Sequence, residues 1–238
     1  MQQPLAFLLR PKSLEDMVWQ DDIRKNIQSF LQKWQIPSMI FRGSPWCGKT
    51  TLANILSKTL QAEFFELSGV KSKKEDLNKI LELANQHKAY GKKTILFLDE
   101  IHRRNKAQQD SLLPFVESGL ITLIGATTEN PSFTINNALL SRCKVIVFQP
   151  LTQDNIIQFF LQNKDKIKQH FPQVALTDEI IDFIAGLSNG DLRNAINILE
   201  SSMMISSDWK LNQDIIMQAF GKPMYYDRDG DEHYNIIS

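Results

Sequence analysis

The stretch GSPWCGKTT, residues 43–51, decides the fold. It fits the pattern G-x-x-x-x-G-K-[ST], a glycine-rich loop that joins a strand to a helix and surrounds phosphate with backbone N–H groups. The apolar run SMIFRG precedes it, and the helix-forming run KTTLANILSKTLQ starts within it. The positive end of such a helix favours bound anions. In this loop the ammonium of Lys49 would reach the β- and γ-phosphates, and the hydroxyl of Thr50 would ligate Mg²⁺.

The run TILFLDE, residues 94–100, supports this interpretation against a chance Gly-Lys-Thr at a helix start. It is a nearly continuous apolar run, typical of a buried parallel strand, and it ends on two carboxylates. Asp99 is predicted to hold magnesium, directly or through water, and Glu100 to polarise the attacking water. We expect these two acids to come from a strand adjacent to the one that enters the loop.

Composition places the chain among ordinary globular proteins. Of 238 residues, 42% are hydrophobic and 23% charged, and 27 basic residues balance 27 acidic ones. No global field therefore draws the chain to nucleic acid or membrane, and any nucleic-acid contact must come from local clusters. The two candidates are KSKK at 71–74 and HRRNK at 102–106, each of which could instead be a solvated charged face.

Targeting and redox signals are weak. No stretch approaches the roughly 18 unbroken apolar residues of a membrane helix. The start MQQPLAFLLRPK lacks a basic region and a long apolar run, so we expect no signal peptide. Two cysteines, Cys47 and Cys143, fit a reducing compartment.

Two regions differ in pattern. Strand-like runs alternate with helical ones up to residue 150, which predicts a doubly wound α/β domain over residues 1–150. Four helical segments follow, several of them opening on Thr, Asp or Asn as plausible caps, and these predict a helical domain over residues 151–221. Residues 222–238 are polar and show no usable periodicity.

Four further residues lie where ligands meet such domains. Thr127 and Thr128 close the strand within 120–130, where a hydroxyl could bond the γ-phosphate or only cap a turn. Arg142 precedes an apolar strand and could reach a neighbouring subunit's nucleotide or form a surface salt bridge. Arg193 starts a helix and could touch phosphate from above or pair with Asp191.

These residues together resemble an AAA+ ATPase of the clamp-loader clade, closest to the replication-associated recombination protein A family, which includes the Werner-helicase-interacting ATPase. The resemblance covers most of the chain and is carried by PLAFLLRPKSLEDMVWQ, SMIFRGSPWCGKTTLA, ILFLDEIHRRNKAQQDSLLPFVESGLITLIGATTENPSF, NNALLSRCKVIVF, GDLRNAINILE and YYDRDGDEHYNIIS. It implies a P-loop parallel-sheet domain followed by an all-helical lid. It also implies a DNA-dependent ATPase that uses ATP and Mg²⁺ at stalled forks, single-strand gaps or duplex ends.

The resemblance also implies a setting. The expected partners are DNA, single-stranded DNA-binding protein or other replication proteins, and further copies of the chain. The expected location is a bacterial cytoplasm, at the nucleoid, or a nucleus. The family continues beyond the HYNIIS-like segment into an oligomerisation domain, so residues 222–238 are interpreted as its start.

Motif matching gives each candidate residue a role. The nucleotide-binding loop comprises Gly43, Ser44, Pro45, Trp46, Cys47, Gly48, Lys49, Thr50 and Thr51. Asp99 and Glu100 match Walker B, Thr128 sensor 1, Arg142 the arginine finger and Arg193 sensor 2. Leu9, Arg10 and Pro11 match the segment near the adenine. Catalysis is expected from Lys49, Glu100, Thr128 and Arg142, and metal binding from Thr50 and Asp99.

The loop departs from the family's G-P-P-G-T-G-K-T at three positions, where Ser44, Trp46 and Cys47 stand. Trp46 replaces a glycine, so a left-handed backbone there would cost about 1–3 kcal/mol and weaken the site. Its side chain could instead point to solvent or to an adjacent subunit. Cys47 lies near a helix N-terminus, which can lower a thiol pKa, so it is either a redox switch or a small polar substitute.

Three functions remain open. The first is the fork-associated ATPase, the second a clamp-loader subunit or branch-migration motor, and the third a module that binds nucleotide without turnover because of Trp46.

Overall fold

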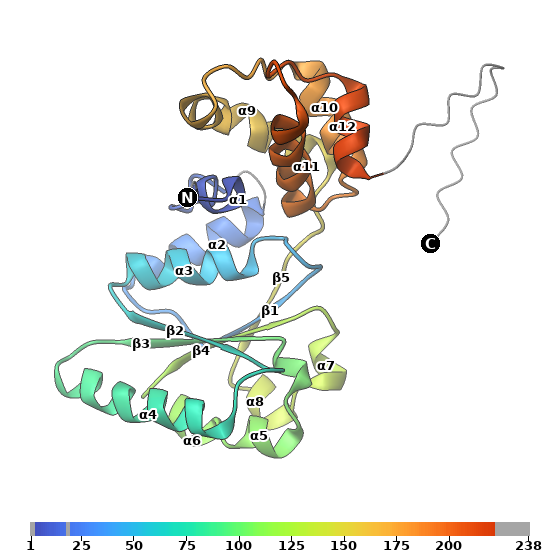
Figure 1. Ribbon diagram of the computed structural model, residues 1–238. Helices are drawn as coiled ribbons and strands as arrows, with labels where there is room; N and C mark the ends of the chain where they lie inside the picture. Colours follow the sequence, from blue (N-terminus) through green and yellow to red (C-terminus); the bar gives the residue numbers. More distant parts are fainter. Residues whose placement is uncertain (1–2, 18–19, 222–238) are drawn as a thin grey trace.

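The computed structural model describes residues 3–17 and 20–221. These residues form a three-layered α/β part with a helical lid beside it (Figure 1). Within them, five parallel strands make one sheet in the order β2-β3-β4-β1-β5. The strands are β1 (Met39–Arg42), β2 (Glu63–Ser68), β3 (Thr94–Asp99), β4 (Thr122–Thr127) and β5 (Lys144–Val147). The predicted α/β fold with a parallel sheet is confirmed.

The sheet order corrects one expectation. Strand β4 pairs with both β1 and β3, so it separates the strand that enters the phosphate loop from the strand that ends on Asp99. The two acids therefore do not come from a strand adjacent to β1. The end of β4, at Thr127, lies between the loop and the acids instead.

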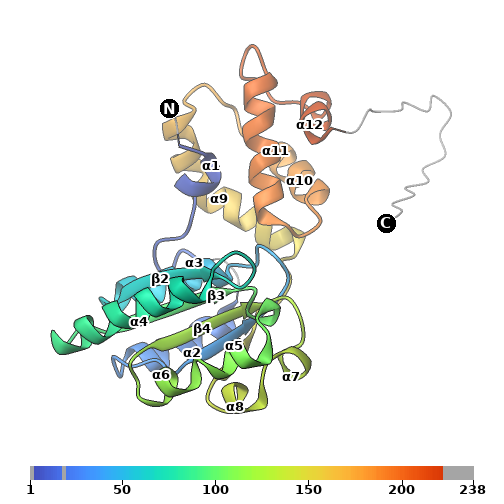
Figure 2. The ribbon, with the colours of Figure 1, turned by 60° about the horizontal axis from the view of Figure 1, so that its bottom comes forward.

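Side chains alternate across the sheet and bury it on both faces. Phe41 and Phe97 point toward α2 (Asp21–Leu31) and α3 (Lys49–Thr59), and they share a core with Ile27 and Leu56. The opposite face, which includes Ile40, packs against α4 (Lys74–Ala89). Figure 2 shows α4 and the short helices α5 (Lys106–Asp110) and α6 (Leu113–Glu117) in front of the strands. Three further short helices, η1 (Ile101–Arg103), α7 (Pro131–Thr134) and α8 (Asn137–Leu140), occur between β3 and β5.

The lid contains the four helices that the sequence predicts. They are α9 (Gln153–His170), α10 (Asp178–Leu187), α11 (Leu192–Ile205) and α12 (Gln213–Phe220). Each begins after a residue whose side chain accepts a hydrogen bond from a first-turn N–H: Thr152, Thr177, Asp191 and Asn212. Such a cap is worth about 1 kcal/mol, which explains where each helix starts.

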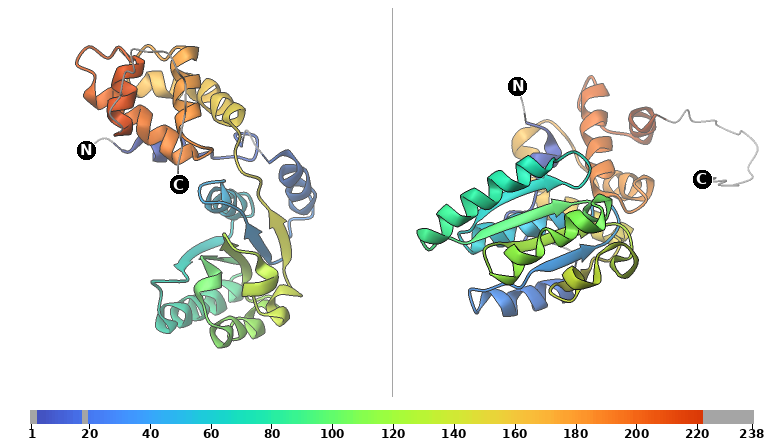
Figure 3. Two further views of the ribbon diagram at one scale, coloured as in Figure 1. Left: turned by 90° about the vertical axis from the view of Figure 1, so that its right-hand side faces the viewer. Right: turned by 90° about the horizontal axis from the view of Figure 1, so that it is seen from below.

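The first helix, α1 (Leu5–Leu8), joins the lid although residues 1–150 were predicted as one α/β domain. Leu5 and Leu9 are buried in the same cluster as the apolar side chains of α9 to α11. The backbone N–H of Leu5 also donates to Oε1 of Glu200 on α11, at 2.9 Å. Figure 3 shows α1, in dark blue, against the lid helices. The predicted segment 222–238 lies outside the described residues.

The chain connects the lid core to the sheet core at two places. Leu9 belongs to the lid core and Leu14 to the sheet core, so residues 10–13 form the first connection. Phe148 belongs to the sheet core and Leu151 to the lid core, so residues 149–150 form the second.

The second connection is held by a side chain from the start of α2. Nε2 of Gln20 donates to the carbonyl of Gln149 at 2.8 Å, and its Oε1 accepts from the N–H of Gln149 at 3.0 Å. A carboxamide that bonds both backbone groups of one residue fixes the course of the chain at that residue.

Among residues 3–17 and 20–221, no helix combines the length and the apolar character needed to cross a membrane.

Candidate nucleotide site

The phosphate loop is anchored at both of its ends. The N–H of Gly43 donates to the carbonyl of Thr127 at 3.1 Å, which ties the loop to the end of β4. A Cβ at Gly43 would lie 2.7 Å from Cβ of Phe148, so only glycine allows this approach. At the other end α3 begins at Lys49, directly after Gly48, whose φ of 99° favours glycine.

The ammonium of Lys49 lies within the curve of the loop. Its Nζ donates to the carbonyl of Gly43 at 2.9 Å and to that of Ser44 at 2.7 Å, and it contacts Sγ of Cys47 at 3.8 Å. The residue is buried. The loop therefore places a cation among its own backbone groups, where the motif predicts phosphate oxygens.

Trp46 adopts the left-handed backbone conformation that the sequence analysis expects to be strained. Its φ is 61°, and the side chain is 49% exposed. The indole does not only face solvent, because Cζ of Arg193 on the lid lies 4.1 Å from the ring centroid. The alternative of an Arg193–Asp191 ion pair is wrong within the described residues, since Asp191 instead caps α11 by accepting from the N–H of Asn194 at 3.0 Å.

Cys47 does not have the environment of a redox switch. It is 1% exposed, and burial raises the pKa of its thiol, although nearby Lys49 acts in the opposite direction. Burial likewise raises the pKa of Cys143 to about 11. Because the thiolate is the reactive form, both thiols are held in their unreactive state at neutral pH. The effect of burial on the pKa of Cys47 outweighs that of the nearby helix N-terminus. This favours the interpretation of Cys47 as a small substitute over that of a redox switch.

Asp99 ends β3, and Glu100 follows it in a sharp turn. Glu100 has φ 52°, and its N–H donates to Oδ1 of Asp99 at 3.1 Å. A Cβ at Gly69 would lie 2.2 Å from the carbonyl oxygen of Glu100, so the residue directly after β2 must be glycine. A left-handed non-glycine residue costs about 1–3 kcal/mol, and such strain is concentrated at functional sites.

His102 holds the carboxylate of Glu100, a role that sequence reasoning missed. Its Nε2 lies 3.2 Å from Oε2 of Glu100 and 3.4 Å from Oε1 of Glu129, and the imidazole is 3% exposed. Its Nδ1 lies 2.9 Å from Oγ1 of Thr127, which also accepts from the N–H of Glu129 at 3.0 Å. One tautomer satisfies every group: the Thr127 hydroxyl donates to Nδ1, and Nε2–H donates to the carboxylates.

The sequence carried only a weak signal for this network. His102 lies in the run 102–106, which the sequence offers as a nucleic-acid contact or a solvated charged face, and Glu129 lies in a stretch that carries the family resemblance but receives no role of its own. A histidine three residues after the first acid of Asp99-Glu100, ahead of a strand that ends on threonine, is the pattern that could have identified it.

The other strand-end candidates are placed differently. Thr127 is fully buried and its hydroxyl bonds to His102, whereas Thr128 lies one residue beyond β4 and is exposed. Arg142 is 41% exposed and makes a salt bridge with Oε1 of Glu117 at 2.5 Å. In the single chain it therefore has the surface ion pair that the sequence offered as its alternative role.

Arg10 reaches the helix that follows the loop. Its Nε donates to Oγ1 of Thr51 at 3.3 Å, and the adjoining Pro11 is half-buried. The run 102–106 is not a uniform basic surface, because Arg104 is buried and donates to the carbonyl of Ser72 at 3.0 Å. That bond brings the two predicted basic runs, 71–74 and 102–106, side by side.

The residues predicted to bind magnesium fit its chemistry. Mg²⁺ prefers oxygen ligands and usually takes one or two from protein, with phosphates and water completing its shell. Thr50 offers a hydroxyl on the first turn of α3, and Asp99 a carboxylate at the end of β3.

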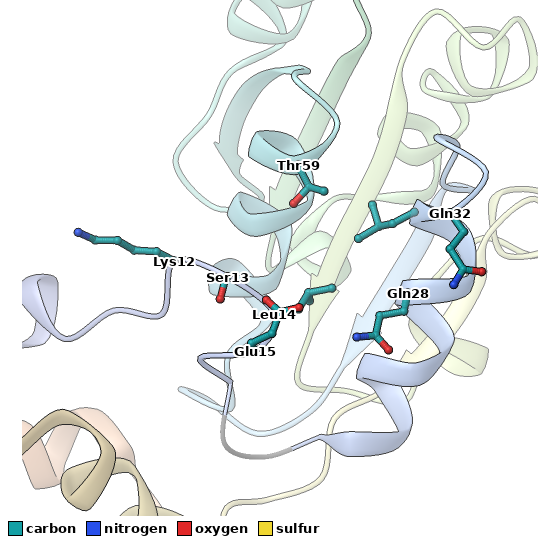
Figure 4. A pocket seen from close by; sticks show the side chains of 8 residues that line it. Lys12, Ser13, Leu14, Glu15, Gln28, Gln32 and Thr59 are labelled. Carbon is teal, nitrogen blue, oxygen red and sulfur yellow. The ribbon is translucent and has the colours of Figure 1, made fainter.

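A separate pocket lies away from the loop. Figure 4 shows it between residues 12–15 and α2, with Gln28 on α2, Gln32 directly after that helix and Thr59 at the end of α3. Its volume is about 500 Å³, and none of its lining residues belongs to the loop 43–51.

Comparisons with known proteins agree with this fold. The sequence matches the ATPase family associated with various cellular activities (AAA) over residues 39–151 and the AAA C-terminal domain over residues 169–238. Replication-associated recombination protein A of Haemophilus influenzae is 38% identical over 245 residues, which cover 99% of this chain and 55% of that protein. ATPase WRNIP1 of Dictyostelium discoideum is 36% identical over 260 residues, which cover 99% of this chain and 30% of that protein. The chain thus spans about half the length of the bacterial relative.

A solved structure shares the architecture. The RuvB Holliday junction branch migration motor of Thermotoga maritima superposes with a TM-score of 0.75 at 27% identity, over 90% of this chain and 72% of that one. A nucleotide-binding P-loop domain with a helical domain after it is common to both. The chain therefore belongs to the AAA family of ATPases, and over nearly its whole length it is similar to replication-associated recombination protein A and WRNIP1.

Proposed function

We propose that this protein binds Mg²⁺-ATP between the phosphate loop and the lid and hydrolyses it, with DNA as the stimulating partner. The observation that carries the proposal is the position of the Glu100 carboxylate. His102 lies 3.2 Å from it, beside the end of β4, and the phosphate loop is hydrogen-bonded to that same strand end. A carboxylate fixed in this way can orient water for attack on a phosphate held by the loop.

In this mechanism the triphosphate is bound by the ammonium of Lys49 and by backbone N–H groups of residues 44–51, except Pro45, which has none; the N–H of Gly43 remains bonded to Thr127. Oε2 of Glu100 bonds to His102, which leaves Oε1 for the attacking water. Mg²⁺, held by Thr50 and Asp99, would supply charge neutralisation on the phosphates. Thr128 would bond the γ-phosphate or the water. Arg142 of a neighbouring copy would stabilise the charge that develops in the transition state, which requires it to leave Glu117.

The biological setting is proposed from the relatives. Replication-associated recombination protein A and the branch migration motor carry names that concern replication, recombination and Holliday junctions. We infer that this protein acts on DNA at forks, single-strand gaps or duplex ends, together with single-stranded DNA-binding protein or other replication proteins, and that it works as a homo-oligomer in a bacterial cytoplasm or a nucleus. A clamp-loader subunit is the less favoured alternative.

Phosphate release measured with and without forked DNA tests this function. We expect slow ATP hydrolysis by the protein alone and a several-fold higher rate with forked DNA than with nuclease-digested DNA of equal mass. Hydrolysis that DNA does not change would contradict the DNA-dependent part of the proposal. Tight ATP binding without any hydrolysis would instead support a module that binds without turnover.

Replacing His102 by alanine is expected to lower kcat about 10-fold while the Kd for ATP stays within twofold, because the carboxylate of Glu100 loses its donor but the loop is untouched. His102→Gln, whose amide N–H can still donate, should recover part of the rate. Steady-state kinetics and ATP titrations of both variants separate the two effects. A parallel rise in Kd and loss of kcat would point to a merely structural role.

A further inference from the structure

The phosphate loop and the lid meet where the indole of Trp46 faces the guanidinium of Arg193. Cζ of Arg193 lies 4.1 Å from the ring centroid, within the range of a cation–π contact. Arg193 is the second residue of α11, and the cap residue Asp191 is occupied by the N–H of Asn194. Within residues 3–17 and 20–221 the guanidinium has no hydrogen bond or ion pair, so the stack on Trp46 is what holds it.

The turn before α11 packs closely against Leu151, the first residue of the lid core after the second connection. Gly190 has φ 76°, and a Cβ there would lie 2.7 Å from the carbonyl oxygen of Leu151. This close approach joins the turn before α11 to the second lid connection. The position of Arg193 is therefore set by backbone packing, and the orientation of its side chain by the indole.

A stacked guanidinium keeps its capacity to bind phosphate. The cation–π contact uses the face of the guanidinium, whereas its five N–H donors lie in the plane. A phosphate oxygen can thus accept from the edge of Arg193 while the face remains on Trp46.

We propose that Trp46 is a positioning residue for Arg193: the indole holds the lid arginine over the phosphate loop, with in-plane donors available to a nucleoside triphosphate. The inference rests on the proposed nucleotide site. The sequence-based expectation was that the backbone strain at Trp46, with φ 61°, only weakens nucleotide binding. In this proposal the indole also supports binding, because it holds Arg193.

A double-mutant cycle on the Kd for a non-hydrolysable Mg²⁺-ATP analogue tests the proposal. Arg193→Ala should raise the Kd about 10-fold or more in the natural protein, as expected for a lost charge-assisted bond to phosphate. In the Trp46→Gly background the same substitution should raise it about threefold or less, because the arginine is no longer held. Trp46→Gly relieves the same backbone strain whether Arg193 is present or replaced by alanine, so this strain cancels from the cycle.

Two further variants serve as controls. Trp34 also has a left-handed backbone, with φ 51°, and is 62% exposed, but it follows α2 outside the site. Trp34→Gly should therefore give the same relief of strain with no change in the effect of Arg193→Ala. Trp46→Phe keeps an aromatic face and should retain most of the coupling, which also serves if the glycine variant folds poorly.

Each outcome decides the matter. An Arg193→Ala effect of equal size in the Trp46 and Trp46→Gly backgrounds would overturn the proposal, as would an unchanged Kd on removing Arg193 alone. If the natural protein binds the analogue but shows no coupling, only this inference fails. If the natural protein does not bind it, the proposed function fails first.

Discussion

Lys49→Ala is expected to abolish detectable ATP binding, with a rise in Kd of more than about 100-fold. The ammonium is the buried cation of the loop, and it lies against the carbonyls of Gly43 and Ser44 at hydrogen-bond distance. Each charge-assisted bond to phosphate contributes about 1.5–3 kcal/mol, so losing two removes about 3 kcal/mol or more. Titration with ATP, followed by calorimetry, measures the change.

The matched control for this substitution is Lys58→Ala. Lys58 lies on the same helix but is exposed in its last turn, so its removal should leave the Kd within twofold. Thermal melting of the two variants should differ little, since water can reach the loop carbonyls that lose the ammonium. Undiminished ATP binding by Lys49→Ala would remove the nucleotide from this loop.

Glu100→Gln is expected to lower kcat by about 10²–10³ while ATP binding is retained, because an amide cannot accept the proton of the attacking water. The amide oxygen can still accept from Nε2 of His102, so the local geometry survives the change. Phosphate release under single-turnover conditions isolates the chemical step from product release.

Glu66→Gln provides the comparison for that result. Glu66 is exposed on the edge strand β2, which β3 and β4 separate from the loop strand β1, and the same substitution there should leave kcat unchanged. Normal phosphate release by Glu100→Gln would refute the role of Glu100 in aligning water.

Much of the fold could be predicted because its elements carry strong local patterns. The strand β3 is an apolar run buried on both faces, and α9 opens on the cap Thr152. The short helices between β3 and β5 have three to five residues, which is too few to show a helical period. The position of β4 between β1 and β3 depends on long-range pairing, so the expectation of adjacent strands was wrong.

The candidate site shows the same division. Its loop and its acids stand in recognisable motifs. The structure brings the loop, the end of β4 and Glu100 together at the carboxyl ends of the strands. The contact of His102 with Glu129 joins residues from different strand ends, and that of Trp46 with Arg193 joins residues 147 positions apart (193 − 46). No local pattern reports such pairs, because they exist only once the sheet and the lid have formed.

The two connections between the sheet core and the lid core define how the molecule can bend. A body attached at two points can turn about the line through them but cannot twist freely, as it could on a single link. From Leu9 to Leu14 five residue steps span at most about 18 Å when fully extended, and the other connection is shorter still. Any rotation of the lid therefore carries α1 with it and pulls on Arg10, which is bonded to Thr51 behind the phosphate loop. The N-terminal segment converts a rotation of the helices into a displacement at the base of α3.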